Sequence, residues 1–260
     1  MERLRYRVDG IFPCPLYTTH RDLNLDESEL QDIESIIEEG MHNNKYNSTS
    51  NDSYIFNTKL GEIKEFCEQH IANYVEKIIN PKEDLDFYIT QSWLNVTRHG
   101  ESHQQHWHPN SIISGAFYIS TVENDGICFH NPLSKEQEMF NILSASHNMF
   151  NSGQRILPVK ALDLILFPSW IEHNVNTNQG DKDRTSIAFN VFARGILGDV
   201  NKLTELHLYD RSMDLEKFNR NYLDCGNNIP LGSASWILIW RCHFMRQSCL
   251  GLYRSIHYTK

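Results

Sequence analysis

Three histidines have the spacing of a metal site. His106 and His108 are two residues apart, and His173 follows about sixty-five residues later. Residues two apart on a β-strand point to the same face, so His106 and His108 can converge on one metal. A third histidine from a distant strand can complete the set. Imidazole suits iron, copper, nickel and zinc alike, and three ligands on one side leave room for a chelating co-substrate and dioxygen.

An arginine–hydroxyl pair follows His173 by eleven residues. In an extended segment 184–190, Arg184 and Ser186 share one polar face with Asn190, while the opposite face is apolar. An arginine fork beside a hydroxyl is well suited to hold a carboxylate. The alternative is a surface strand with an ordinary ion pair. Next to His173 we favour the carboxylate anchor, and the whole set predicts a non-haem iron(II) oxygenase that uses 2-oxoglutarate.

Other side chains compete for the metal. His103 is the main rival, but at three residues from His106 it need not share a strand face. His130 ends an apolar run and could approach the site. Asp163 and Glu172 are possible carboxylate ligands, although Asp163 falls at a strand start and Glu172 should point away from the neighbouring histidine.

Two amphipathic helices are expected in the first third of the chain. Apolar spacing predicts amphipathic helices over 28–39, with Ser28 as N-cap, and over 61–79. Residues 7–20 alternate enough to enter a sheet, at an edge because of their prolines. Residues 41–58 are rich in Asn and Ser and favour a loop.

After Pro81 the pattern changes to short β-rich runs separated by turn signals, which is typical of an all-β sandwich or barrel core. The expected strands are 87–97, 112–120, 126–130, 162–167, 172–175 and 184–192. Two helices before such a core predict a mainly β (α+β) jelly roll with the helices packed outside one sheet. The long polar segment 134–157, with Lys135, His147 and Arg155, is the best candidate for a substrate lid.

Composition bounds the class of protein. The 260 residues are 40% hydrophobic and 22% charged, typical of one large soluble domain. A net charge of −9 makes nucleic acid an unlikely partner. Six scattered cysteines without a C-x-x-C pair, no secretory signal and no transmembrane segment favour a cytoplasmic protein.

The last part of the chain differs from the rest. Residues 225–260 contain no acidic side chain, and their charged residues are Arg241, Arg246, Arg254 and Lys260. Three interpretations stay open: a basic amphipathic helix on a membrane or partner surface, a helix packed on the acidic domain, or a segment outside the evolved fold.

Together these segments resemble a known family. They are residues 12–16 (FPCPL), 95–100 (NVTRHG), 106–118 (HWHPNSIISGAFY), 164–173 (LILFPSWIEH), 184–190 (RTSIAFN) and 194–199 (RGILGD). They resemble the 2-oxoglutarate–Fe(II) oxygenases often encoded by tailed phages and marine bacteria. The resemblance covers about residues 7–210, and the motifs are specific together rather than singly.

The resemblance implies a double-stranded β-helix (cupin-like) domain over 1–210, with a helical lead-in at 20–80, a β core at 86–195 and a C-terminal extension at 211–260 of unknown role. It implies Fe(II) held by His106, His108 and His173, and 2-oxoglutarate held by Arg184 and Ser186. His108 stands where the wider superfamily has Asp or Glu, so it is either a third ligand or a residue that supports the ligands without binding the metal. Asn95 and Tyr118 are candidates to line the co-substrate site, with Trp93 and Phe167 nearby, although ordinary sheet packing explains each of these four equally well.

The implied activity is hydroxylation of a substrate by dioxygen, coupled to conversion of 2-oxoglutarate to succinate and carbon dioxide. Two alternatives remain: a cupin-like metal oxidoreductase without 2-oxoglutarate, which needs no anchor such as Arg184 and Ser186, and a non-catalytic jelly-roll binding module. The substrate, small molecule or peptide, and the oligomeric state are not readable from the sequence.

Overall fold

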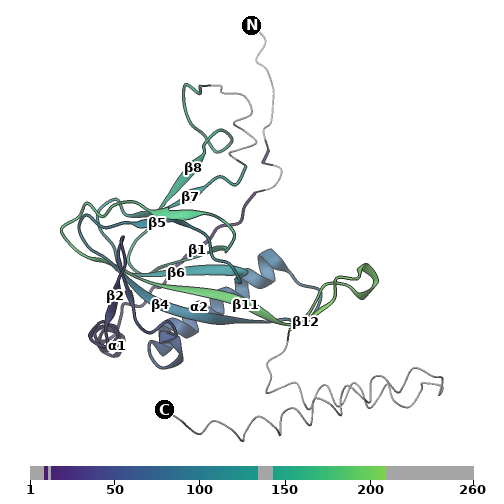
Figure 1. Ribbon diagram of the computed structural model, residues 1–260, viewed down its shortest axis with the longest axis horizontal. Coiled ribbons are helices and arrows are strands. Elements are labelled where there is room, and N and C mark those ends of the chain that lie inside the picture. The colour runs from purple at the N-terminus through teal and green to yellow at the C-terminus, as the bar shows by residue number, and fades with distance from the viewer. Residues whose placement is uncertain (1–8, 11–12, 134–142, 209–260) are drawn as a thin grey trace, which may run out of the picture. The chain divides into compact units, whose positions relative to one another are not determined.

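Two antiparallel sheets lie face to face in the described part of this computed structural model, which comprises residues 9–10, 13–133 and 143–208 (Figure 1). The larger sheet has the order β1 (Tyr17–His20), β9 (Asp163–Pro168), β6 (Ile113–Ser120), β11 (Arg184–Leu197), β4 (Asp86–Thr97), β3 (Ser48–Ser50) and β2 (Met41–Asn43), with β12 (Leu206–Leu208) paired to β11. The smaller sheet has the order β5 (His103–His106), β10 (His173–Val175), β7 (Gly126–His130) and β8 (Gln154–Pro158).

The chain crosses repeatedly between the sheets. β4, β6, β9 and β11 belong to the larger sheet, whereas β5, the β7–β8 pair and β10 belong to the smaller one. This alternation of antiparallel strands is the double-stranded β-helix, so the predicted fold class is confirmed. Its consequence is that residues far apart in sequence meet in the space between the two sheets.

Successive side chains of β11 point to opposite faces of the larger sheet, where they meet two different hydrophobic cores. Ile187, Phe189 and Val191 are fully buried in the core that also holds residues of the helices. A Cβ on Gly115 of β6 would lie 2.1 Å from the Phe189 ring, so glycine is required there. The opposite face of β11 carries Ser186 and Ala188, whose register partners Tyr118 and Ala116 belong to the core between the two sheets.

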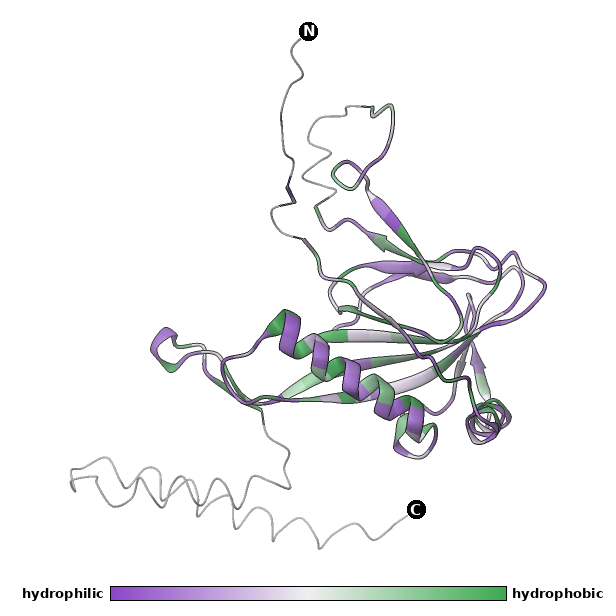
Figure 2. Cartoon of the chain, turned by 180° about the vertical axis from the view of Figure 1, so that it is seen from behind, coloured by the Kyte–Doolittle hydropathy of each residue, from purple (hydrophilic) through white to green (hydrophobic). Residues whose placement is uncertain are grey.

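The helices begin close to their predicted positions. α1 spans Glu27–Glu38 and α2 spans Gly61–Tyr74, followed by the π-helical turn η2 (Val75–Ile79). α2 runs along the outer face of the larger sheet (Figure 2). The predicted N-cap Ser28 is wrong: Asp26 caps α1 by accepting from the Glu29 amide at 2.8 Å, and Glu29 returns the bond in a capping box.

Segments predicted as loops contain short strands. Residues 41–58 form β2, β3 and the 3-10 turn η1 (Ile55–Asn57), because Ser48 and Ser50 are small enough to be buried with their hydroxyls bonded. β8 overlaps the end of the expected loop 134–157. Among the described residues of the predicted edge 7–20, only Tyr17–His20 pair as a strand. The short turn η3 (Val200–Lys202) precedes β12.

Several predictions lie outside the described residues, namely the extension 211–260 and Lys135 of the expected lid. Among the described cysteines, Cys14, Cys67 and Cys128 are free. The described helices lack the length and apolar character that a membrane crossing requires. The cytoplasmic location stays a prediction.

Candidate metal and co-substrate site

The smaller sheet places two of the three histidines side by side. His106 ends β5, His173 begins β10, and the two residues are direct partners in the antiparallel register. Directly opposed residues project from the same face of a sheet. Their ring centroids are 4.4 Å apart. His106 and His173 therefore reach one point between the two sheets from neighbouring strands.

His108 reaches the same point by a different route from the one predicted. β5 ends at His106, so strand alternation does not align the two rings. Instead the His108 amide donates to the Ser169 carbonyl at 2.9 Å, in the turn between β9 and β10. This bond holds the residues that follow β5 against the turn before β10, and His108 Nε2 lies 3.0 Å from His106 Nε2.

Backbone carbonyls fix the orientation of two rings. His106 Nδ1 lies 2.7 Å from the Gln104 carbonyl, and His173 Nδ1 lies 3.0 Å from the Ile171 carbonyl. A carbonyl oxygen only accepts, so each Nδ1 carries the proton and each Nε2 keeps a lone pair. Such outer partners are the usual way in which metal-binding histidines are held.

Side chains of the larger sheet orient the third ring. His108 Nδ1 lies 2.5 Å from Asn190 Oδ1 and 2.9 Å from Ser114 Oγ. Ser114 and Ser169 are fully buried and are linked by a 2.8 Å hydrogen bond, which Ser169 extends to Ser111 at 2.7 Å. The sequence argument assigned no role to these serines; only the polar face of 184–190 pointed to Asn190.

The three histidines form one donor set. A ring nitrogen from each of His106, His108 and His173 lies within 4.8 Å of the others, and no other such group of His, Cys, Asp or Glu occurs among the described residues. Burial lowers the pKa of His108 to about 4 and that of His173 to about 3, and it also lowers the pKa of His106. All three rings are therefore neutral near pH 7.

These rings fit a divalent metal. Two lone pairs facing each other at 3.0 Å repel unless a cation lies between them. Two imidazole nitrogens bound about 2.1 Å from one metal, at a right angle, are about 3 Å apart. The arrangement therefore matches adjacent ligand positions on one ion, and neutral imidazole suits iron among other metals.

The rival ligands do not join this donor set. The His103 ring contacts His106 at 4.4 Å between centroids without joining the donor group. The other three have partners of their own: His130 with Asn174 at 2.7 Å, Asp163 with His20 at 2.9 Å, and Glu172 with Gln105 at 2.5 Å. The described residues thus offer no carboxylate to the three histidines.

Arg184 is buried at the far end of the same inter-sheet space. Its Nε atom lies 3.0 Å from Oδ2 of Asp125, which is also buried, without the alignment of a hydrogen bond. The guanidinium carbon lies 5.2 Å from the centre of the Tyr118 ring. Burial lowers the pKa of His103 to about 4, and the charges of His106 and Arg184 add to this lowering. Asp125 was not predicted, and nothing in the sequence singles it out.

The other predicted co-substrate residues share one row. Ser186 is the register partner of Asn95 on β4 and of Tyr118 on β6. The three residues therefore project from the same face, and Tyr118 belongs to the core between the two sheets. Asn95 accepts a hydrogen bond from Thr49 at 3.1 Å. The structure thus brings Arg184, Ser186, Asn95 and Tyr118 together in one region.

Aromatic rings line the approach to the histidines. The Phe167 ring meets His173 edge-on at 4.8 Å between centroids, and Trp93 lies 5.9 Å from His108. Phe129 packs against Phe167 at 5.0 Å. These side chains form an apolar wall on one part of the surroundings of the histidines.

One family model matches the part of the chain that contains the candidate site. Residues 91–190 match the family model described as "Putative 2OG-Fe(II) oxygenase". That span contains all three histidines together with Arg184 and Ser186. Residues 91–190 are therefore similar to an oxygenase family whose printed name refers to Fe(II) and 2-oxoglutarate. The phage or marine type stays a prediction. A search of curated protein sequences gives no match.

Several solved structures are similar to this chain at low sequence identity. SnoK, a non-heme alpha ketoglutarate dependent carbocyclase from nogalamycin biosynthesis, is 12% identical with a TM-score of 0.50, covering 76% of this chain and 89% of its own. A 2OG-Fe(II) oxygenase family oxidoreductase from Burkholderia pseudomallei is 10% identical with a TM-score of 0.47, covering 68% and 84%. HygX from Streptomyces hygroscopicus, solved with nickel, 2-oxoglutarate and hygromycin B, is 10% identical with a TM-score of 0.45, covering 68% and 82%.

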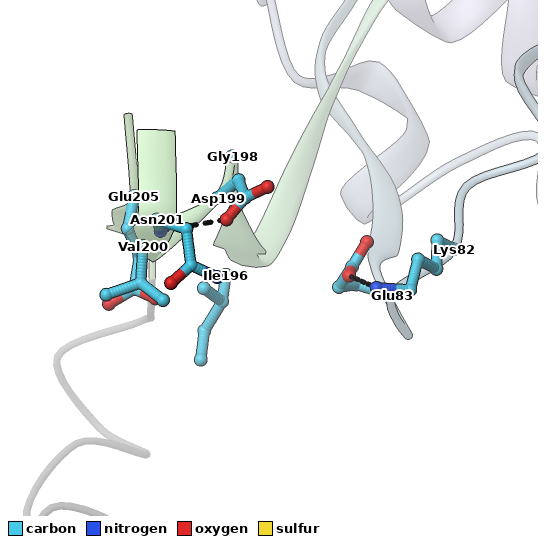
Figure 3. Close-up of a pocket in the computed structure, with 8 residues that line it drawn as sticks. All are labelled: Lys82, Glu83, Ile196, Gly198, Asp199, Val200, Asn201 and Glu205. Atoms are coloured by element: carbon cyan, nitrogen blue, oxygen red, sulfur yellow. Dashed lines mark hydrogen bonds and ion pairs between the residues drawn. The ribbon is translucent and has the colours of Figure 1, made fainter. Parts of the chain in front are cut away.

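A pocket at another part of the molecule does not include these residues. It lies between the turn preceding β4 and the turn that links β11 to β12 (Figure 3). Its polar contacts are the Lys82–Glu83 ion pair at 3.5 Å and the bond from the Asn201 amide to Asp199 at 2.9 Å. It offers no nucleophile or ring of ligands, and we assign it no chemistry.

Proposed function

We propose that the chain is an Fe(II)- and 2-oxoglutarate-dependent dioxygenase that hydroxylates a C–H bond of its substrate. The balanced reaction takes the substrate, 2-oxoglutarate and dioxygen to the hydroxylated product, succinate and carbon dioxide. The observation that carries the proposal is the pair of unprotonated Nε2 atoms of His106 and His108, which face each other at 3.0 Å with His173 beside them.

His106, His108 and His173 would hold the iron in this proposal. When bound, the iron supplies the activation of dioxygen and the oxidative decarboxylation of the co-substrate. The protein contributes neutral ligands in fixed orientations, because the Nδ1 atoms are held by two backbone carbonyls and by Asn190. Three neutral imidazoles leave the full metal charge in place, which favours binding of a dianionic co-substrate.

Arg184 would bind the distal carboxylate of 2-oxoglutarate. Its guanidinium is buried, and Asp125 offsets part of its charge. In this proposal the remaining donors of the guanidinium fork would contact the carboxylate. Ser186 and Tyr118 lie in the same row and offer hydroxyls to the same carboxylate. A buried, charge-assisted contact of this kind is stronger than an exposed one.

The apolar wall serves a separate purpose. Phe167 and Trp93 border His173 and His108, and Phe129 extends the wall away from the histidines. These rings leave little room for water near the reacting atoms, which favours coupling of co-substrate oxidation to the substrate over side reactions.

The proposal is tested by anaerobic titration with Fe(II) and 2-oxoglutarate, following the weak visible charge-transfer band of their complex. We expect a band in the wild type, its loss in His173→Ala, and a shift to higher 2-oxoglutarate concentration in Arg184→Ala. His130→Ala is the matched control, because His130 projects from the outer face of the same sheet and bonds to Asn174. It should leave the titration unchanged.

Each negative result of this titration would favour a different class of protein. Iron binding without a 2-oxoglutarate-dependent band would reject the co-substrate and favour a cupin-like oxidoreductase, with Arg184 as an ordinary partner of Asp125. No iron binding would leave a jelly-roll binding module. With the band established, succinate release in the presence of candidate substrates then identifies what is hydroxylated.

A further inference from the structure

We propose that Arg155 on β8 selects the primary substrate by binding an anionic group on it, a carboxylate or a phosphate. In this proposal the substrate's carbon skeleton lies along Phe129, between that anion and the histidines. The inference rests on the proposed function, because it names the class of substrate that the same site would accept.

The strand register places Arg155 in line with the histidines. Across the smaller sheet, His106 pairs with His173, His173 pairs with Phe129, and Phe129 pairs with Arg155. Directly opposed residues of antiparallel strands project from the same face. Neighbouring strands are about 4.8 Å apart, so Arg155 and His173 are separated by about 10 Å at the backbone.

Alternation along β8 confirms which face Arg155 occupies. Leu157, two residues further on, packs into the core between the sheets together with Ile127. Gln154 instead lies within 3.7 Å of Cys128, whose side chain alternates with those of Ile127 and Phe129. Arg155 is therefore on the inner face of the sheet, with the metal-site residues, and not on the outer one.

Burial decreases along this row toward Arg155. His173 is buried, Phe129 is half-buried and Arg155 is exposed. β8 is the edge strand of the smaller sheet. A molecule entering over this edge therefore meets the arginine first, then an aromatic surface, and then the histidines.

Arg155 has no ion-pair or hydrogen-bond partner for its side chain among the residues that the structure describes. The guanidinium is therefore free to contact a ligand. The buried Arg184, by contrast, is paired with Asp125. An unpaired guanidinium beside an aromatic wall matches a ligand with one anionic end and an apolar body.

The test uses three probes that share a phenyl group: phenylacetate, phenyl phosphate and the neutral phenylacetamide. Binding to the anaerobic Fe(II)- and 2-oxoglutarate-saturated protein is measured by equilibrium dialysis, so that Arg184 is already occupied. We expect at least one anion to bind about tenfold more tightly than the amide, because the guanidinium contact is charge-assisted. The better anion tells carboxylate from phosphate.

Variants assign that preference to one side chain. Arg155→Ala and Arg155→Gln should abolish the preference, whereas Lys160→Ala should retain it, because it removes one positive charge from the residues just after β8. Circular dichroism checks that the variants fold. Equal or unmeasurable binding of both anions and the amide to the wild type would overturn the proposal and leave Arg155 as a charge that protects a sheet edge.

A preference that survives in Arg155→Ala but is lost in Arg184→Ala would also overturn the proposal, because the anions would then occupy the co-substrate site. The charge-transfer band is recorded on the same samples. Protein that shows the band but no anion preference refutes only the role of Arg155. Absence of the band refutes the proposed function instead, and the anion preference is then judged on the protein without 2-oxoglutarate.

Discussion

The Nε atom of Arg184 lies 3.0 Å from Oδ2 of Asp125, and both side chains are buried. Asp125 is itself held in place, because its Oδ1 accepts from the Gly126 amide at 2.8 Å in the turn between β6 and β7. Burying a cation without a partner costs free energy, and the Asp125 carboxylate offsets part of that cost for Arg184. The pair thus links a turn of the smaller sheet to the proposed co-substrate anchor.

Replacing Asp125 should weaken co-substrate binding. Asp125→Asn keeps the shape but removes the charge that orients the guanidinium, so we expect the KM for 2-oxoglutarate to rise about tenfold or more. Steady-state succinate release measures it. Asp86→Asn is the control, because Asp86 pairs with Arg194 in an exposed contact at the other end of β11. An unchanged KM in a correctly folded Asp125→Asn protein would contradict a positioning role.

His108 can be tested as a ligand by restoring the carboxylate that related sites use. We expect His108→Asp to keep Fe(II) binding within about tenfold of the wild type, because aspartate also ligates iron in facial sites. His108→Ala should weaken Fe(II) binding by more than the 10–100-fold typical of an outer partner. Isothermal titration under anaerobic conditions gives both values. Wild-type affinity in His108→Ala would show that His106 and His173 suffice.

Asn190 should act on iron through His108. Asn190→Ala removes the acceptor 2.5 Å from His108 Nδ1 and frees the ring to rotate or change tautomer. We expect a loss of Fe(II) affinity of about 10–100-fold. Asn174→Ala is the matched control, since Asn174 bonds to His130 on the outer face of the smaller sheet. Equal effects of the two substitutions would indicate general destabilisation, which thermal unfolding would reveal.

The sequence predicted the long strands and the chemistry-bearing residues of the site well. It predicted poorly the contacts that bring those residues together. β4, β6 and β11 begin within one residue of their predicted starts, because alternation of apolar and polar residues is strong in long strands. The strand β3 was missed because it buries Ser48 and Ser50, whose hydroxyls accept from Arg98 and Leu94, partners that are distant in sequence.

Within the site, the histidines and Arg184 were found because their residue types carry the chemistry. Their supporting residues were not, since a serine such as Ser114 or a turn aspartate such as Asp125 is ordinary in sequence. The convergence of His106 and His108 was predicted for the wrong reason. It depends on the bond from the His108 amide to Ser169, a contact across 61 residues that no local pattern encodes.

The metal-free protein should lose stability as pH falls below about 6.5, the pKa of an unperturbed histidine. Burial lowers the pKa of His108 to about 4 and that of His173 to about 3 in the folded state. Between about pH 6.5 and these folded-state pKa values, the unfolded chain binds more protons than the folded protein. Lowering the pH through this window therefore favours unfolding. Melting temperatures from pH 8 to pH 4.5 should be level at first and then decline.

In His173→Gln the decline should be shallower, whereas His42→Gln, at an exposed position on β2, should follow the wild type. Equal slopes for wild type and His173→Gln would mean that water reaches the His173 ring, and that the dry, neutral donor set assumed for iron binding does not exist in the metal-free protein.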